Sequence, residues 1–289
     1  MTEIKGKDQH EHWDIVLQPK TGLFNINLGE VWHYRDLMWL FVRRDFIAQY
    51  KQTVLGPLWH IIQPLLTTVM FLIVFGRIAN IPTDNIQPVL FYMSGIAIWN
   101  YFSSCLTSTS STFTANAAIF GKVYFPRLVI PISVIISNMV RFGIQFLLLV
   151  TFMGYYHFNG FPIHTGVSFF LLPILVLMMA GIGFGLGIII SSFTTKYRDF
   201  AVLLGFAVQL AMYATPVIYP LSFLESTKYK WLIEINPLTS IVEAFRFSLF
   251  GRGTFTAVSL GYSAGFMLLV IFIGIVIFNK VEKSFMDTV

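Results

Sequence analysis

Charged side chains are scarce in this sequence of 289 residues. Only 11% of the residues are Asp, Glu, Lys or Arg, whereas an ordinary soluble domain has about 25%. The long stretch from Gln52 to Thr195 contains only these charged residues: Arg77, Asp84, Lys122, Arg127 and Arg141. A soluble helical domain needs a charged face at every turn or two, so this stretch excludes an ordinary soluble fold.

The sequence also lacks the residue patterns of enzymes and metal sites. Its single cysteine, Cys105, excludes an intramolecular disulfide. The six histidines have no metal-ligand spacing, and no Ser and His are placed together for nucleophilic catalysis. No glycine-rich loop precedes a Lys-Ser or Lys-Thr pair, because the glycines between 181 and 187 lie inside an apolar segment, where small residues favour close helix packing. We therefore expect this chain to have no catalytic residue and to bind no metal or ATP itself.

Long hydrophobic runs occupy most of the chain. Hydrophobic residues make up 56% of it and its mean hydropathy is +0.72. About twenty apolar residues cross a hydrocarbon core roughly 30 Å thick. We predict an all-α integral membrane protein with six transmembrane helices, at about 57–77, 88–111, 128–155, 167–193, 199–217 and 257–279.

The basic residues predict how these spans are oriented. Residues 1–29 are polar and contain no apolar segment typical of a signal peptide, so we expect them to stay in the cytosol. Thirteen of the nineteen Lys and Arg side chains fall on the N-terminal side of the predicted spans and five on the other side. Because cytosolic loops carry the excess of Lys and Arg, we expect both termini of the predicted transmembrane domain, 53–289, to be cytosolic. The net charge of +5 is then a topology signal and predicts no nucleic-acid partner.

The segment 30–52, ahead of the first span, has the pattern of an amphipathic helix. Apolar residues recur at helical spacing from Val31 to Val42, and charged or polar residues alternate with them. We predict an interfacial helix from Glu30 to Tyr50, in the headgroup plane of an anionic cytosolic leaflet. The alternative is a solvated helix of a small cytosolic domain.

The segment between the fifth and sixth spans is too polar to cross a membrane and too apolar for a plain loop. Asn236 and Pro237 form a helix start, because Asn caps a helix and Pro fits its first turn. We predict two short helices at about 221–234 and 237–250. Both are expected to be re-entrant from the extracytoplasmic side or to cap the bundle.

Arg141 is the costliest residue in the predicted spans, since a charge at mid-membrane costs about 2.5–3.5 kcal/mol on insertion scales. Asn138, Arg141 and Gln145 form one polar stripe on the third span. This stripe indicates a wet conduit or a subunit interface. The alternative is that Arg141 pairs with a buried carboxylate that the sequence does not identify.

Aromatic residues near the extracytoplasmic end of the bundle form a second candidate feature. Aromatic faces stack on sugar C–H groups, so these residues could line a path for a polar glycan. The alternative is the aromatic belt found at the interface of many membrane proteins. The residues of this predicted path are Trp99, Tyr101, Phe102, Tyr213 and Tyr219.

After about residue 30 the sequence resembles the membrane subunit of ABC-2 type polysaccharide and polyol-phosphate exporters, the group that moves lipid-linked O-antigen, capsule or teichoic acid chains. Several stretches in the same order carry the resemblance. The second of them includes Lys-Val-Tyr-Phe-Pro-Arg at 122–127, and the third includes Thr-Pro-Val-Ile-Tyr-Pro at 215–220. The stretches are 43–59, 116–131, 195–220 and 235–246.

The resemblance implies a permease that works as a homodimer with two copies of a separate ATP-binding subunit, which holds the ATP and Mg. It implies that a lipid-linked glycan enters from the cytosolic leaflet of the cytoplasmic (inner) membrane, in contact with membrane lipid. Three groups of residues acquire roles. The residues of an interfacial gate helix are Arg43, Arg44, Asp45, Tyr50 and Lys51. A coupling helix that docks on the ATPase contains Asn116, Ile119, Phe120 and Lys122, and we expect Ile119 and Phe120 to be exposed. The residues of an extracytoplasmic gate are Asn236, Pro237, Glu243 and Arg246.

Three rival functions remain at this point. An ABC-2 exporter of a smaller lipid or drug would share the fold. A membrane-bound lipid-linked sugar transferase would need clustered acidic residues at the membrane surface, and the acidic residues here do not cluster in that way. A secondary transporter would show two related halves and intramembrane acids, neither of which is evident.

Overall fold

The structure is a computed structural model that describes residues 28–51, 53–120, 122–123, 125–161, 166–197, 199–225 and 227–285. The predicted polar lead, 1–29, therefore lies almost wholly outside the described residues. The part of the chain that the structure describes is helical and contains no strand. The longer helices are α2 (Arg35–Tyr50), α3 (Trp59–Phe71), α4 (Pro88–Ser110), α6 (Val129–Phe158), α7 (Leu172–Thr194), α8 (Asp199–Tyr213), α10 (Pro237–Phe250) and α11 (Ala257–Phe285).

Five helical segments are long and apolar enough to cross a membrane. They correspond to five of the six predicted spans, and they are Gly56–Ile78, Pro88–Ser110, Val129–Phe158, Ser168–Thr194 and Ala257–Val281. The first of them combines a 3-10 turn, α3 and a π-helical turn at Leu72–Ile78. The fourth begins as a 3-10 helix at Val167–Leu171 and continues as α7.

The helix in the predicted fifth span, 199–217, is shorter than expected. α8 ends at Tyr213 and has 15 residues, which at 1.5 Å per residue reach roughly 22 Å, less than the roughly 30 Å of a hydrocarbon core. The helix ends early because Pro216 has no N–H to donate. In addition, the carbonyl oxygens of Pro216 and Val217 accept hydrogen bonds from Arg246 instead of continuing the helix.

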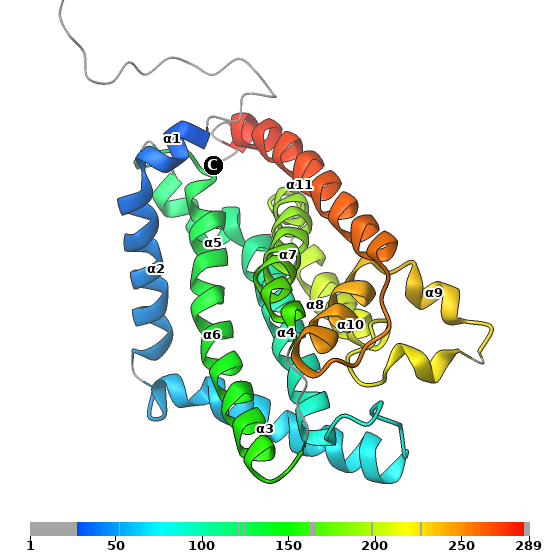
Figure 1. Cartoon of the computed structure of the whole chain (residues 1–289). Coiled ribbons are helices and arrows are strands. Elements are labelled where there is room, and N and C mark those ends of the chain that lie inside the picture. Colours follow the sequence, from blue (N-terminus) through cyan, green and yellow to red (C-terminus); the bar gives the residue numbers. More distant parts are fainter. Residues whose placement is uncertain are drawn as a thin grey trace, which may run out of the picture.

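Close packing around α7 builds the centre of the bundle (Figure 1). A Cβ at Gly183 would lie 3.0 Å from the Cβ of Cys105 on α4, and one at Gly187 would lie 2.6 Å from the Cβ of Thr109. On its other side, a Cβ at Gly185 would lie 2.7 Å from the backbone carbonyl carbon of Val270 on α11. The glycines therefore let α4 and α11 approach both sides of α7, as the sequence predicts.

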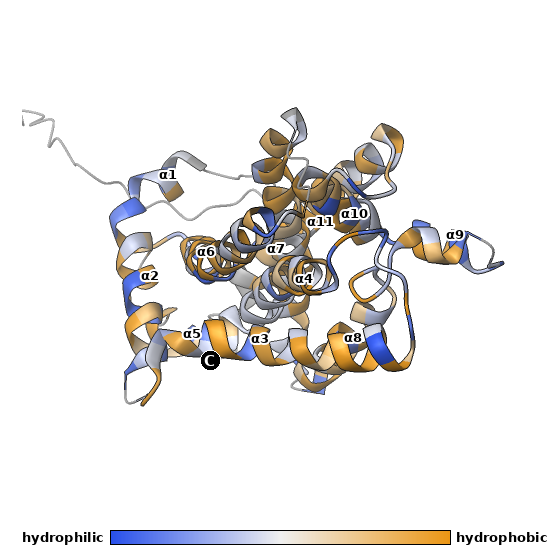
Figure 2. Ribbon diagram, turned by 60° about the horizontal axis from the view of Figure 1, so that its bottom comes forward, coloured by the Kyte–Doolittle hydropathy of each residue, from blue (hydrophilic) through white to orange (hydrophobic). Residues whose placement is uncertain are grey.

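The bundle is layered by burial. α4 and α7 are mostly buried, whereas the first and last spans expose most of their apolar surface. Figure 2 shows α3 and α8 coloured largely as hydrophobic, while α2 carries hydrophilic turns between hydrophobic ones. An exposed apolar helix surface is what a lipid bilayer or a second subunit would cover.

The segment predicted to be an interfacial helix is helical, but the helix is not continuous. α1 (Leu28–His33) and α2 are separated at Tyr34, whose ψ of 22° departs from helical geometry. The buried face of α2 consists of Met38, Phe41 and Val42, which lie on the predicted apolar stripe. α2 packs against α6 (Figure 1), so its apolar face is covered by the bundle at least as much as by a lipid surface.

The segment between α8 and α11 differs from the prediction in its first half. Instead of one helix at 221–234, it has a 3-10 turn at Leu221–Leu224 and a short α9 at Lys230–Glu234. Residues from other segments fix this turn: Leu221 donates its N–H to Glu243, and Ser222 donates its hydroxyl to Asp84. The second half, α10, has the predicted bounds of about 237–250.

Candidate functional site

A polar cavity of about 320 Å³ lies among α2, α3, α4 and α6. Two of the four helices are candidate spans along their whole length, and α3 is part of a third. Polar side chains inside a transmembrane bundle mark candidate substrate or ion pathways. The lining residues are Gln49, His60, Gln63, Pro64, Asn100, Tyr101, Ser103, Ser104, Asn138, Arg141, Phe142 and Gln145.

The predicted stripe on α6 contributes three of these residues, and the structure brings them together with α4. Arg141 donates from Nη1 to Oδ1 of Asn138 over 2.9 Å. Asn100 on α4 donates to Oε1 of Gln145 over 3.4 Å. Within the described residues no carboxylate lies at salt-bridge distance from Arg141. The part of the chain that the structure describes therefore contains no carboxylate that could be the predicted buried partner of Arg141.

The end of α2 reaches the same place. The ring of Tyr50 lies edge-on to the ring of His60 on α3, with centroids 5.6 Å apart. Burial raises the pKa of the Tyr50 phenol, and the nearby Arg141 charge only partly offsets this. The phenol therefore stays protonated at neutral pH and can donate a hydrogen bond.

The predicted aromatic path is only partly brought together. Tyr101 lines the cavity and packs on Phe142, with ring centroids 5.0 Å apart. Trp99 and Phe102 are 4% and 2% exposed, belong to the hydrophobic core and do not line this cavity. They pack on each other because α4 is surrounded by neighbouring helices on nearly all sides.

The other two aromatics of that path lie after α8. Tyr219 donates its hydroxyl to the backbone oxygen of Tyr213 over 2.9 Å, and Tyr213 is half exposed. Neither residue lines the polar cavity. The bond closes the turn that follows α8, which gives this pair a local structural role.

The charged residues assigned to the gate helix lie along α2. Arg44 and Asp45 form an ion pair at 2.7 Å, and the Arg44 guanidinium lies 4.7 Å from the ring centroid of Phe41. Arg43 and Lys51 are exposed. Arg44 also donates to Oδ1 of Asn116 over 3.4 Å, so α2 directly contacts the segment assigned to coupling.

That coupling segment is a helix, α5 (Thr112–Phe120), and the structure corrects the expected exposure of Phe120. Phe120, expected to be exposed, is 2% exposed and packs with Phe113 and Phe125 beneath α2. Ile119 is half-buried, and Asn116 is buried, donating to the Thr112 oxygen over 3.0 Å. The surface after α5 is formed instead by exposed Lys122 and Val123, with Val123 57% exposed.

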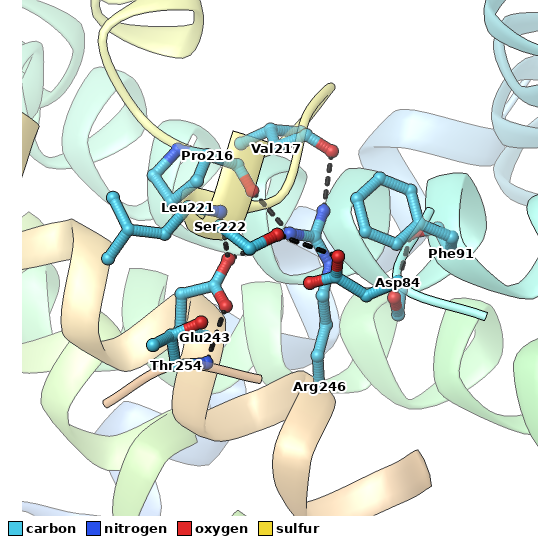
Figure 3. Close-up of polar contacts among 10 residues, drawn as sticks. Asp84, Phe91, Pro216, Val217, Leu221, Ser222, Glu243, Arg246 and Thr254 are labelled. Carbon is cyan, nitrogen blue, oxygen red and sulfur yellow. Dashed lines mark hydrogen bonds and ion pairs between the residues drawn. The ribbon is translucent and has the colours of Figure 1, made fainter. Parts of the chain in front are cut away.

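Two of the residues assigned to the extracytoplasmic gate, Glu243 and Arg246, lie in a fully buried cluster (Figure 3). The Arg246 guanidinium donates to the backbone oxygens of Pro216 at 2.5 Å and Val217 at 2.6 Å, and lies 3.8 Å from the ring centroid of Phe91. It also bonds Glu243 at 3.3 Å. Both side chains are 1% exposed.

Glu243 extends this cluster to two further segments. Its carboxylate accepts the N–H of Leu221 at 3.3 Å and that of Thr254 at 2.9 Å. Asp84, in the loop before α4, holds Ser222 at 2.6 Å. The cluster thus ties the turn after α8, the turn before α9 and the loop after α10 to one helix, α10.

Asn236 is the cap that the sequence predicts. Its side chain accepts the N–H of Leu238 at 3.0 Å, with Pro237 in the first turn of α10. The same side chain donates to the Ala214 oxygen and to the Thr215 hydroxyl, both at 2.9 Å. The cap therefore also fixes the end of α8.

Sequence reasoning missed several members of both sites. His60, Gln63 and Asn100 are isolated polar residues in apolar spans, and that isolation was the available signal. Asp84 is the only acidic residue between Gln52 and Thr195 and could have been flagged as a partner for a distant cation.

The fold and the cavity define a class of protein: a multi-pass helical membrane protein with a polar site inside the bundle. The particular family follows from comparison. The sequence profile of the ABC-2 type transporter family matches residues 36–250, well over half of the chain. The chain therefore belongs to the ABC-2 type transporter family, as a membrane subunit.

Named relatives cover nearly the whole chain. It is 30% identical over 264 residues to an O-antigen export system permease protein RfbA of Klebsiella pneumoniae, a match that covers 90% of this chain and 96% of that protein. A protein of the same name from Myxococcus xanthus is 28% identical over 220 residues, 75% of this chain and 81% of that protein. The polysialic acid transport protein KpsM of Escherichia coli is 25% identical over 253 residues, 85% of this chain and 93% of that protein.

Proposed function

We propose that this chain is the transmembrane permease of an ATP-driven ABC exporter that moves a lipid-linked polysaccharide across the cytoplasmic membrane. The observation that carries the proposal is the near full-length similarity to permeases named for O-antigen export and polysialic acid transport. The polar cavity inside an otherwise apolar bundle also supports the proposal, because a polar substrate needs polar side chains along its path. The cargo class is O-antigen, capsule or a teichoic-acid-like chain.

The working assembly is a homodimer of this chain with two copies of an ATP-binding subunit. The large exposed apolar surfaces of the first and last spans and of α8 support a second copy and lipid as their covering. ATP and Mg belong to the partner subunit, because this sequence has no phosphate-binding loop.

The topology has six membrane-crossing segments and places both termini in the cytosol. The fifth of these in chain order is the predicted segment 199–217, which consists of α8 and the few residues that follow it. α1 and the last turns of α11 lie at the same end of the molecule (Figure 1), which supports this orientation. α9 and α10 then lie at the extracytoplasmic face.

Coupling to the ATPase uses the surface that follows α5. Exposed Lys122 and Val123 are the contact residues, and buried Phe120 supports them from below. Through the bond between Arg44 and Asn116, a movement of α5 reaches α2 directly. α2 in turn ends beside the polar cavity, so the gate helix connects the docking surface to the substrate path.

The proposal is tested by reconstitution in proteoliposomes. The purified chain alone should hydrolyse no ATP, whereas the chain together with its ATP-binding subunit should hydrolyse ATP and deliver a lipid-linked glycan to the opposite leaflet. Hydrolysis by this chain alone would refute the subunit assignment. Transport of a small amphipathic drug with no transport of glycan would favour the smaller-substrate exporter instead.

A further inference from the structure

The polar cavity contains a cation without an anion. Arg141 is the only residue of its lining with a permanent charge, and no Asp or Glu is among the lining residues. Asp45 is a carboxylate whose charge acts on Arg141, and it is paired with Arg44 at 2.7 Å. A charge that is poorly compensated inside an apolar bundle is costly, which favours binding of an external anion.

Three buried polar atoms around the cavity also lack a hydrogen-bond partner among the described residues. They are Nδ2 of Asn138, Nε2 of His60 and Oη of Tyr50. Asn138 is 2% exposed and lies beside the thiol of Cys105, which is only a weak acceptor. Each of the three atoms can donate a hydrogen bond to a ligand beside Arg141.

The remaining lining residues can supply further donors. Gln49 and Gln63 add two more amides, and Ser103 and Ser104 add two hydroxyl groups. A guanidinium with several neutral donors is the arrangement that binds a phosphate group, whose oxygens accept several hydrogen bonds at once. A metal cation would instead need acidic ligands, which this lining does not contain.

One wall of the cavity faces outward as an apolar surface. Gln63 and Pro64 of α3 line the cavity, while Leu66, Val69 and Met70 on the same helix are 60%, 50% and 58% exposed. A lipid chain can lie along that exposed face while its headgroup enters between the helices. The site therefore suits an anion attached to a lipid better than an anion free in water.

We propose that the cavity around Arg141 and Asn138 binds the phosphate group of a lipid phosphate ester. This inference rests on the proposed export of a lipid-linked glycan and identifies the part of that substrate that the cavity recognises. Arg141 supplies the charge and a two-pronged contact, and Asn138, His60 and Tyr50 supply further donors. The glycan itself need not contact these residues.

The test measures lipid binding to the full-length chain in a neutral detergent, by native mass spectrometry. The probes are hexadecyl phosphate, hexadecanol and inorganic phosphate. We expect hexadecyl phosphate to bind and hexadecanol, which has the same chain without the anion, to bind at least about tenfold more weakly. Competition by inorganic phosphate that depends on Arg141 would assign the same oxyanion site to a water-soluble ligand.

Two variants test the residues, and one serves as a matched control. Arg141→Gln removes the charge. Asn138→Asp is nearly isosteric and gives Arg141 an internal carboxylate at an atom already 2.9 Å away, so it should fold while excluding an external anion. Both should weaken binding of hexadecyl phosphate by at least about tenfold. Arg77→Gln removes the same charge from an exposed position outside the cavity and should bind as the unaltered chain does.

Equal binding of hexadecyl phosphate and hexadecanol would overturn the inference, as would unchanged binding in Asn138→Asp. The proposed function is tested separately, by glycan transport in the presence of the ATPase. If the unaltered chain transports glycan but shows no preference for the phosphate, only the anion site is wrong. If it binds the phosphate but transports no glycan, the exporter assignment fails instead.

Discussion

Two arginines in this bundle occupy opposite environments. Arg246 is fully buried on α10, where its guanidinium donates to two backbone oxygens and to Glu243 and lies over the Phe91 ring; among the described residues only its Nε lacks a hydrogen-bond partner. Arg141 lies on α6 beside a polar cavity, and its hydrogen-bond partner is the neutral amide of Asn138. Both are cations in an apolar protein, but only one has its charge balanced by the chain itself.

The difference separates a structural cation from an available one. Removing one partner of a buried ion pair is strongly destabilising, because the other charge is left uncompensated. A cation at a cavity with a single neutral partner contributes little to folding and carries an insertion cost. Burial alone therefore does not separate the two arginines; a carboxylate partner among the described residues does.

The largest expected effect comes from Arg246→Leu. The change leaves Glu243 buried without its cation and frees the oxygens of Pro216 and Val217, at a cost of about 3–5 kcal/mol. Since the same cluster holds three chain segments, we expect little folded protein in the membrane. Quantitative immunoblotting and size-exclusion profiles in detergent measure this. A normal yield of monodisperse protein would show that the cluster is not a structural tie.

The contrast between the two arginines could not be obtained from the sequence. Each lies in an apolar helical pattern, and the stripe of Asn138, Arg141 and Gln145 was visible because its members are close in sequence. The partners of Arg246 at Pro216 and Val217 are about thirty positions away and are backbone atoms, which no side-chain pattern reveals.

Other predictions succeeded or failed for the same physical reason. Five of the six predicted spans and the Asn236 cap depend on local hydrophobicity and local hydrogen bonds, which the sequence encodes directly. The burial of Phe120 depends on α2 folding over α5, and the helix expected at 221–234 is interrupted where Asp84 and Glu243 hold its first turn. Long-range contacts decided both of these points.

A smaller effect is expected from adding one methyl group near each arginine. A Cβ at Gly95 would lie 2.6 Å from the Val217 oxygen and 2.8 Å from Nη2 of Arg246, whereas a Cβ at Gly143, two residues after Arg141, has nothing within 4 Å. Gly95→Ala should therefore cost about 1–3 kcal/mol through overpacking. Gly143→Ala should be neutral or stabilising, because Ala favours a helix over Gly by about 1 kcal/mol.

Thermal unfolding in detergent, followed by the loss of monodisperse protein, compares the two glycine variants directly. A lower midpoint for Gly95→Ala and an unchanged or higher one for Gly143→Ala would confirm the contrast. Equal destabilisation by both would mean that the surface near Gly143 is also tightly covered, for instance by a second copy of the chain.

The smallest effect on folded protein, and the most informative one for function, is expected from Arg141→Leu. Leucine removes an insertion cost of about 2.5–3.5 kcal/mol and forfeits one hydrogen bond to Asn138, worth about 1.5–3 kcal/mol because it involves a charged group. These effects nearly cancel, so membrane abundance should stay close to normal. Export of glycan to the cell surface should fall sharply, because the cavity loses its only permanent charge.

Arg141→Lys keeps a cation but loses the planar two-pronged contact, so its export should lie between the two extremes. Arg77→Leu provides the matched control, since it also removes one arginine, from an exposed position away from the cavity. Abundance and export of Arg77→Leu should both be normal. Full export by Arg141→Leu at normal abundance would show that Arg141 has no role in export. Low abundance would instead make Arg141 a structural cation like Arg246, with a partner contributed by another chain.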